Sequence, residues 1–133
     1  KLRQSVFVED TGLAVNAWNG LPGAMVKWFL KTVGNDGFCK MLSGFEDRSA
    51  VATSCIGSFN GEKFTCFSGS VNGQIVRKPR GISGFGWDPI FQPAGWEKTF
   101  AEMNSEEKNL VSMRKKAVLN LKDYLLSHKL KPD

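Results

Sequence analysis

The stretch that decides the fold covers residues 84–117 and reads GFGWDPIFQPAGWEKTFAEMNSEEKNLVSMRKKA. Its first half sets three aromatic residues, Phe85, Trp87 and Phe91, among glycines and prolines. Glycine and proline interrupt regular structure, so this half predicts a shaped loop rather than a strand. The second half predicts a helix that begins near Ser105 and carries two glutamates in its first turn, where the helix dipole favours negative charge.

The polar face of that predicted helix carries Lys108, Ser112 and Arg114. A loop of flat apolar rings beside cationic donors suits a ligand that combines a flat heterocycle with phosphates. The structural alternative is that the aromatic side chains belong to the core and the charges to a solvated face.

Composition places the chain among ordinary globular proteins, with 133 residues, 41% hydrophobic and 23% charged. We expect a single domain over residues 1–133 and no membrane segment, because the apolar runs are too short to span a bilayer. The net charge of +5 suits a polyanionic ligand. Nucleic acid is a competing polyanion, but the sequence contains no helix-turn-helix, zinc-finger or ribonucleoprotein motif, and much of the excess charge is terminal.

Cysteine and histidine content narrows the chemistry. Three cysteines, Cys39, Cys55 and Cys66, are an odd number without Cys-x-x-Cys spacing, so we expect reduced, buried thiols in a cytoplasmic protein. The single histidine, His128, lies at the end of the last predicted helix. The sequence therefore excludes two kinds of site for the loop and helix at residues 84–117: a metal site built from histidines, and a catalytic Ser-His triad.

The first part of the chain alternates strand and helix signals. Residues 5–9 predict a short strand that ends at the carboxylates Glu9 and Asp10, and acidic residues at such a strand end lie where α/β proteins place ligands. A plain polar turn is the alternative. After a turn at residues 19–23, a helix is expected over residues 24–32, stopped near Gly34.

We expect that helix to bury Met25, Trp28, Phe29 and Val33 and to point Lys27 away from this face. A second short helix, capped by Asp36, is expected over residues 37–43. Residues 49–59 and 62–70 then predict two strands of a hairpin, because Asn60-Gly61 between them is a strong hairpin signal.

A second Asn-Gly pair, Asn72-Gly73, predicts another turn into a third strand at residues 74–76. The long strands of this meander also offer a surface for a dimer. In the basic loop 77–83, Arg80 either contacts a phosphate or is solvated. The final helix repeats apolar residues at helical spacing, which we expect to pack on the sheet: Leu110, Met113, Ala117, Leu121, Tyr124 and Leu125. The whole pattern predicts an α/β fold, a mixed sheet with flanking helices.

Several short segments, in order and spacing, resemble the inosine triphosphate pyrophosphatase family. They are Glu9-Asp10-Thr11-Gly12-Leu13, Gly86-Trp87-Asp88-Pro89-Ile90-Phe91, Thr99-Phe100-Ala101-Glu102-Met103, Glu107-Lys108-Asn109 and Ser112-x-Arg114. One departure is Met113, where the family has histidine. The similarity runs over nearly the whole chain and matches the carboxyl-terminal two thirds of a family member. The expected fold is therefore an incomplete or shortened version of that family's fold, either a fragment or a naturally short relative.

The resemblance implies hydrolysis of deaminated purine nucleoside triphosphates, inosine and xanthosine triphosphate and their deoxy forms, to monophosphate and pyrophosphate. Asp10 and Glu9 would be the catalytic residues and the ligands of Mg²⁺, with Asp10 as the general base. The expected substrate-binding residues are Thr11, Lys27, Phe85, Gly86, Trp87, Asp88, Lys108, Ser112 and Arg114. Within this set Lys27 and Lys108 would offset phosphate charge, Phe85 and Trp87 would wall the base pocket, and Arg114 would read the base.

Three functions compete on these grounds. The leading expectation is a cytoplasmic, homodimeric pyrophosphatase acting on a small-molecule nucleoside triphosphate. The second is a degenerate or truncated relative that binds nucleotide weakly without efficient turnover. The third is a basic nucleic-acid-binding domain, whose affinity would weaken steeply as salt rises.

Overall fold

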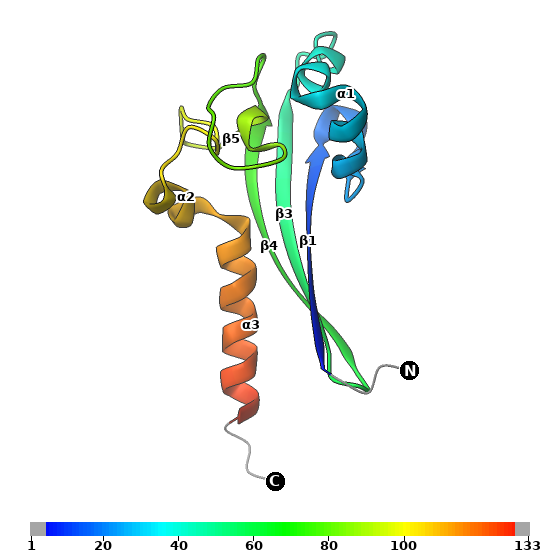
Figure 1. Ribbon diagram of the computed structural model, residues 1–133, viewed down its shortest axis with the longest axis vertical. Coiled ribbons are helices and arrows are strands. Elements are labelled where there is room, and N and C mark those ends of the chain that lie inside the picture. Colours follow the sequence, from blue (N-terminus) through cyan, green and yellow to red (C-terminus); the bar gives the residue numbers. More distant parts are fainter. Residues whose placement is uncertain (1–4, 130–133) are drawn as a thin grey trace.

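The computed structural model describes residues 5–129 and is shown in Figure 1. Its strands are β1 (Val6–Val15), β2 (Pro22–Gly23), β3 (Ser49–Phe59), β4 (Phe64–Ile75) and β5 (Phe91–Pro93). Its α-helices are α1 (Val26–Met41), α2 (Ser105–Val111) and α3 (Met113–Lys129), and two short 3-10 turns cover Asn16–Trp18 and Asp88–Ile90. Within the described residues, no helix is both long and apolar enough to cross a membrane.

The strands form one sheet in the order β2-β1-β3-β4-β5, and all four pairings are antiparallel. The expected α/β class with flanking helices is confirmed, but the sheet of the described residues is antiparallel and not mixed as predicted. In Figure 1 the long strands run the length of the molecule, with α3 beside their lower half and α1 and the aromatic loop at their upper end. The buried core gathers at that upper end and includes Leu13, Phe38, Trp87, Phe91 and Phe100.

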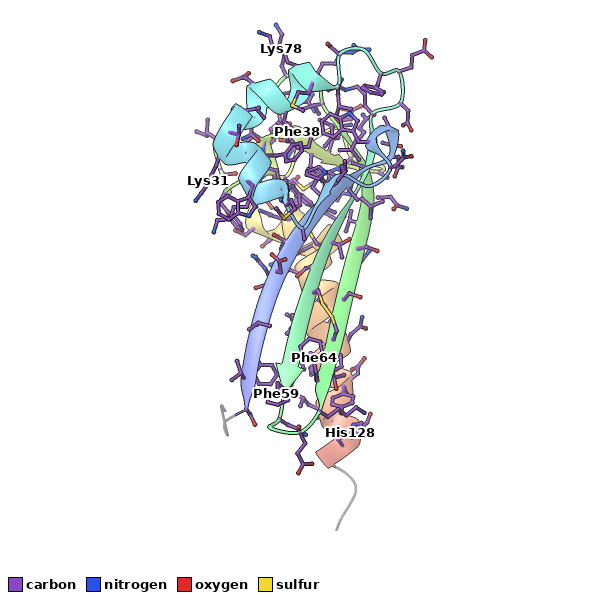
Figure 2. All side chains as sticks on the ribbon, turned by 90° about the vertical axis from the view of Figure 1, so that its right-hand side faces the viewer. Lys31, Phe38, Phe59, Phe64, Lys78 and His128 are labelled. Atoms are coloured by element: carbon purple, nitrogen blue, oxygen red, sulfur yellow. A yellow bond between two sulfur atoms is a disulfide. The ribbon has the colours of Figure 1, made fainter. Side chains whose placement is uncertain are left out.

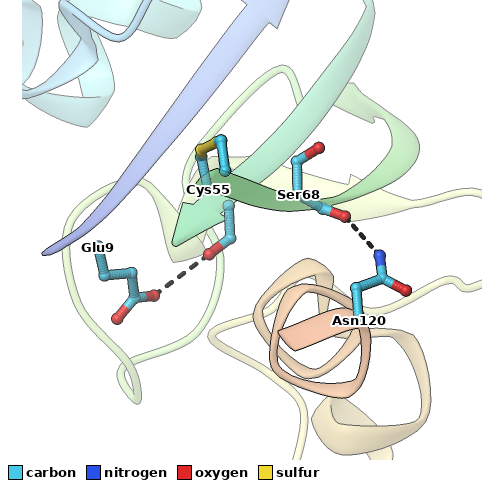
Figure 3. The surroundings of a disulfide bond; sticks show 6 residues. Glu9, Cys55, Ser68 and Asn120 are labelled. Atoms are coloured by element: carbon cyan, nitrogen blue, oxygen red, sulfur yellow. Dashed lines mark hydrogen bonds between the residues drawn. A yellow bond between two sulfur atoms is a disulfide. The ribbon is translucent and has the colours of Figure 1, made fainter. Parts of the chain in front are cut away.

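Helix α3 covers one face of the lower sheet. Tyr124 packs on Phe67 with ring centroids 5.0 Å apart, and the Asn120 side-chain amide donates to the Ser68 carbonyl at 2.9 Å. Gly69 allows the close approach, because a Cβ there would lie 2.3 Å from the Met113 carbonyl oxygen. Figure 3 shows Asn120 on one side of the strands and a disulfide on the other, so the face opposite α3 is a separate surface.

Strand β1 is longer than predicted, and this changes the position of the two carboxylates. Its pairing with β3 runs without interruption from Val6 opposite Phe59 to Val15 opposite Ala50. Glu9 and Asp10 therefore lie within the strand and not at its end, which corrects the prediction. Because side chains alternate along a strand, the two carboxylates point to opposite faces of the sheet.

The predicted turn at Asn72-Gly73 is also wrong. Strand β4 continues through both residues, which pair with Val51 and Ala50, and the next neighbour in the sheet is β5 rather than residues 74–76. A hairpin turn of the Asn-Gly type requires a positive φ, which Gly73 does not adopt. Glycine is needed for a different reason: a Cβ at this position would lie 2.4 Å from the Gln92 carbonyl oxygen of β5.

The helices are interrupted where the sequence predicted, but some side chains predicted to be buried are exposed. Helix α1 kinks at Gly34, whose φ of 67° is left-handed, so the expected stop there is confirmed. Its buried side is formed by Val26 with the partly buried Phe29 and Leu30, whereas Trp28, expected in the core with Met25 and Val33, is 57% exposed. The spacing 26, 29, 30 fits a helical face equally well, and tertiary packing selected it.

The expected final helix is divided in two at Ser112, whose backbone is extended (φ −64°, ψ 126°). Met113 and Ala117 are buried as predicted, because α3 begins its own contact with the sheet there. Leu110, assigned to the same stripe, is 72% exposed, since the break turns α2 away from the face that α3 presents, and Leu125 is also exposed.

The cysteines depart from the expectation of three reduced thiols. Cys55 and Cys66 form a disulfide, whereas Cys39 is free and buried, and burial raises the pKa of its thiol to about 11. Cys55 faces Ser68 and Cys66 faces Gly57 across β3 and β4, so the two are diagonal neighbours on one face. Figure 2 shows the disulfide on the side of the strands turned away from α3.

Candidate functional site

A groove of about 760 Å³ lies between β1, α1 and the aromatic loop. It is lined by Asp10, Thr11, Ala24, Val26, Lys27, Trp28, Leu30, Lys31, Phe85, Gly86 and Trp87. It therefore contains a carboxylate from the sheet, two lysines from the helix and exposed aromatic surface from two elements. A cleft with one apolar wall and a few convergent polar groups is the usual form of a small-molecule site.

Asp10 contributes the groove's carboxylate. Its side chain is exposed, and its Oδ1 accepts the backbone N–H of Thr11 at 2.9 Å. None of the ion pairs found among residues 5–129 involves Asp10. Across the strand it faces Cys55 of the disulfide. An exposed carboxylate without a cationic partner is available to a metal ion or to a water molecule.

Glu9, its neighbour, is held on the other face of the sheet. Its carboxylate forms an ion pair with Arg114 Nε at the start of α3 and accepts the hydroxyl of the buried Ser54 at 3.2 Å. Figure 3 marks the hydrogen bond from the Ser54 hydroxyl to Glu9 with a dashed line. Glu9 thus fixes Arg114 to the sheet, and only two of the three nitrogens of the guanidinium remain for other partners.

A second, smaller hollow lies on that side of the aromatic loop. It is lined by Thr11, Phe85, Trp87, Asp88, Lys108, Ser112, Met113 and Arg114. Phe85, Trp87 and Thr11 line both this hollow and the groove. The guanidinium carbon of Arg114 lies 5.6 Å from the centre of the Phe85 ring, within the range of a cation–π contact.

The buried carboxylate of Asp88 organises the loop between the two hollows. Asp88 is 4% exposed, and its Oδ2 accepts both Lys108 Nζ at 2.6 Å and the Phe85 N–H at 3.0 Å. The same ammonium group lies 5.7 Å from the Phe85 ring centre. Trp87 packs beneath on Phe91 and Phe100, with ring centroids 5.6 and 6.1 Å away. The buried Trp87 ring therefore forms one wall of the hollow, and the exposed Phe85 ring forms the other.

Helix α2 carries Lys108 to this position by a local sequence signal. Asn104 caps the helix by accepting the N–H of Glu107, and the Glu107 carboxylate accepts the N–H of Asn104 in return. Lys98 also donates to that carboxylate, and these hydrogen bonds hold the pKa of Glu107 below its usual value. The helix therefore begins at Ser105, as predicted.

The structure brings most of the predicted site residues together. Six line the groove, namely Asp10, Thr11, Lys27, Phe85, Gly86 and Trp87, and Asp88, Lys108, Ser112 and Arg114 line the adjoining hollow. Glu9 lines neither and reaches the hollow through Arg114. Arg80 lies elsewhere and ties its loop to Gln92 and to the Glu97 carbonyl. The role of each residue in binding or catalysis stays a prediction.

Three residues of the site were missed by reading the sequence. Trp28 and Lys31 line the groove, with the Lys31 ammonium 5.2 Å from the Trp28 ring centre, and Ser54 donates to Glu9. Lys31 follows Lys27 by one helical turn, a spacing that places both on one face and could have identified it. Ser54 carried no local signal, because its partner is 45 residues away.

Loss of the Lys108 charge tests whether this lysine is structural. We expect Lys108→Met to lower the free energy of unfolding by about 1–3 kcal/mol, because the buried Asp88 carboxylate would lose its cation. Lys98→Met, which removes the cation of an exposed ion pair, is the matched control and should have a much smaller effect. Urea denaturation of both variants measures this. Equal effects would mean that the buried Asp88 pair contributes no more to stability than the exposed pair does.

Comparison with known proteins identifies the family to which this chain is similar. The model of the Ham1 family matches residues 1–124. An inosine triphosphate pyrophosphatase of Candida albicans is 49% identical over 124 residues, which are 92% of this chain and 61% of the relative. One from Schizosaccharomyces pombe is 48% identical over 126 residues, 93% of this chain and 66% of the relative. The chain thus spans less than two thirds of the length of these curated relatives.

A solved structure shares the fold described above. The Ham1 protein of Staphylococcus aureus superposes with a TM-score of 0.87 at 29% identity, covering 96% of this chain and 69% of that protein. The expected family fold is confirmed over the part that this chain covers. Because the family model matches residues 1–124 of the 133 in this chain, the chain belongs to the Ham1 family.

Proposed function

We propose that this chain carries the site of a pyrophosphatase that cleaves deaminated purine nucleoside triphosphates to monophosphate and pyrophosphate. Relatives about half identical to it are named inosine triphosphate pyrophosphatases. The observation that carries the proposal is the groove, in which the Asp10 carboxylate, which forms no ion pair within residues 5–129, shares a cleft with Lys27 and the exposed Phe85 ring. This combination suits a ligand with a flat base, phosphates and a reacting phosphorus atom.

In the proposed reaction a water molecule attacks the α-phosphorus. The bond between that phosphorus and the oxygen bridging to the β-phosphate breaks, and pyrophosphate leaves. Asp10 accepts the proton of the attacking water as general base. Lys27 and Lys31 on α1 offset phosphate charge from the opposite wall of the groove.

Mg²⁺ is part of the proposal. Residues 5–129 contain no group of three His, Cys, Asp or Glu side chains that could hold a metal ion. Mg²⁺ is usually bound by one or two carboxylates and completes its shell with water and substrate phosphates, so the exposed Asp10 carboxylate fits such a site. Glu9 is the second candidate ligand, but it lies on the opposite face of the sheet from Asp10 and would have to leave Arg114 and change face to reach the same ion. The bound ion would neutralise charge on the triphosphate.

We assign recognition of the base to Arg114 and Phe85. Deaminated purines carry a carbonyl oxygen at position 6, and Arg114, which lines the hollow, is a permanent donor whose Nε is occupied by Glu9. An amino group at position 6, as in adenine, is itself a donor and cannot pair with Arg114. Phe85, Trp87 and Ser112 complete the surroundings of the base.

Substitution of Asp10 tests the reaction itself. We expect Asp10→Asn to lower kcat for inosine triphosphate by about 10²–10⁴-fold, the usual contribution of a general base. Asp123→Asn, an exposed aspartate of α3, is the control and should leave kcat unchanged. Chromatography of labelled substrate should give monophosphate and pyrophosphate as products. Orthophosphate as the main product would contradict the proposed reaction.

Base selectivity provides a separate test. We expect Arg114→Ala to reduce the preference for inosine over adenosine triphosphate, measured as the ratio of kcat/KM values, by about 5- to 150-fold, which is the loss of 1–3 kcal/mol. Lys115→Ala removes an exposed neighbouring cation and should leave the ratio unchanged. An unaltered ratio in the Arg114 variant would assign base reading to other groups.

We also propose that the chain forms a homodimer. Val8 and Phe64 are 57% and 61% exposed on the face opposite α3, where both side chains cover Gly57, and exposed apolar surface marks sites of association. Sedimentation velocity should show a dimer that dissociates on Phe64→Lys. A monomeric chain would remove the dimer from the proposal and leave the reaction untouched.

A further inference from the structure

The aromatic loop at residues 84–87 is attached on both sides of the groove. On the side of α2 and α3, Asp88 accepts the Phe85 N–H, and Lys108 and Arg114 approach the Phe85 ring. On the side of α1, the Asn35 amide Nδ2 donates to the Gly86 carbonyl at 3.0 Å. Asn35 is 51 residues away in sequence, and none of the assignments above includes it.

The Asn35 contact depends on an unusual local backbone. Asn35 follows Gly34, where α1 kinks with a φ of 67°, and the loop it holds contains two further left-handed glycines, Gly84 at 79° and Gly86 at 60°. The Oδ1 atom of the Asn35 amide is buried and finds no donor among the described residues. An orphaned buried oxygen is destabilising, so stability alone gives little reason for an asparagine here.

The position of the contact matters because Gly86 is part of the groove lining. The facing wall is formed by Leu30 and Lys31 in the helical turn before the kink. Phe85 is 64% exposed, so its ring is placed by the backbone of the loop more than by packing. A tie between Asn35 and Gly86 therefore sets how far the Phe85 ring stands from α1.

We propose that Asn35 is a positioning residue that fixes the aromatic loop against α1 and so sets the width of the groove that receives the nucleotide. The inference rests on the proposed function, since it takes a nucleoside triphosphate as the ligand. Asn35 does not line the groove itself and acts through Gly86. Its loss should therefore weaken binding and leave the chemical step unchanged.

Asn35→Asp tests the donor without changing the shape of the side chain. At neutral pH the variant presents a carboxylate oxygen to the Gly86 carbonyl, two acceptors that repel each other. When the carboxyl group is protonated, near its ordinary pKa of about 4, it can donate again. The defect should therefore shrink as pH falls from about 7 to about 3.5, where most of the carboxyl is protonated, when each value is divided by that of the unsubstituted chain at the same pH.

Asn120→Asp is the matched control. The Asn120 amide makes the same kind of contact, to the Ser68 carbonyl at 2.9 Å, but on α3 and outside the groove (Figure 3). Three quantities are measured for both variants: hydrogen exchange of the amides of residues 85–87, the dissociation constant for inosine triphosphate, and KM and kcat with Mg²⁺. Asn35→Ser, which keeps a shorter donor, is the second variant if Asn35→Asp does not fold.

We expect Asn35→Asp to speed exchange in the loop and to raise KM and the dissociation constant by about three- to tenfold, the effect of one lost hydrogen bond. The value of kcat should not change, and Asn120→Asp should bind as the unsubstituted chain does. Unchanged affinity despite faster exchange would overturn the inference, as would an equal loss of affinity in the Asn120 variant or a defect that persists at acidic pH. If the unsubstituted chain binds no inosine triphosphate, the proposed function fails first and the inference with it.

Discussion

The buried Asp88 carboxylate is the constraint on which the site depends. A charge with almost no solvent access must be compensated by a cation and by hydrogen bonds, and Lys108 and the Phe85 N–H provide both. Meeting that requirement fixes three things together: the direction of the aromatic loop, the position of α2, and the distance of the Lys108 ammonium from the Phe85 ring. The loop is therefore shaped by electrostatics as well as by its glycines.

The long strand β1 divides the site into two sides. Alternation along the strand sends Asp10 and Glu9 to opposite faces, so neighbouring residues with similar side chains have different surroundings. Asp10 stays exposed beside the lysines of α1, whereas Glu9 is held by Arg114 and Ser54. Thr11, Phe85 and Trp87 border both sides and connect them.

Local signals in the sequence predicted the elements that depend on local chemistry. Strand β3 has the predicted bounds, Gly34 interrupts α1, and the start of α2 follows from its capping box. The prediction that the aromatic loop adjoins Lys108 and Arg114 came from the resemblance to a family together with the spacing of residues 84–117.

What could not be predicted depends on distant partners. Gly73 reads as a turn residue until β5 is placed beside it, and Trp28 reads as core because its spacing fits a buried face as well as Phe29 does. The hairpin predicted around Asn60-Gly61 already brought Cys55 and Cys66 together, and the observed register, with Phe59 opposite Phe64, makes them diagonal neighbours joined by a disulfide. No pattern in the sequence indicated the contact of Asn35, because its partner is a backbone carbonyl in a loop far along the chain.

The ion pair of Glu9 with Arg114 bears on the metal-ligand role predicted for Glu9. The same carboxylate that neutralises Arg114 is the one that would serve as a second ligand for a cation. The ion pair with Arg114 and the binding of a cation would both use the negative charge of the Glu9 carboxylate. A cation that attracts Glu9 would therefore weaken the ion pair and leave more of the Arg114 guanidinium free for a base carbonyl. By the reciprocity of linked binding, a base that engages Arg114 favours release of Glu9 toward the cation. If both proposals hold, recognition of the base and binding of the metal would be coupled through a single side chain on β1.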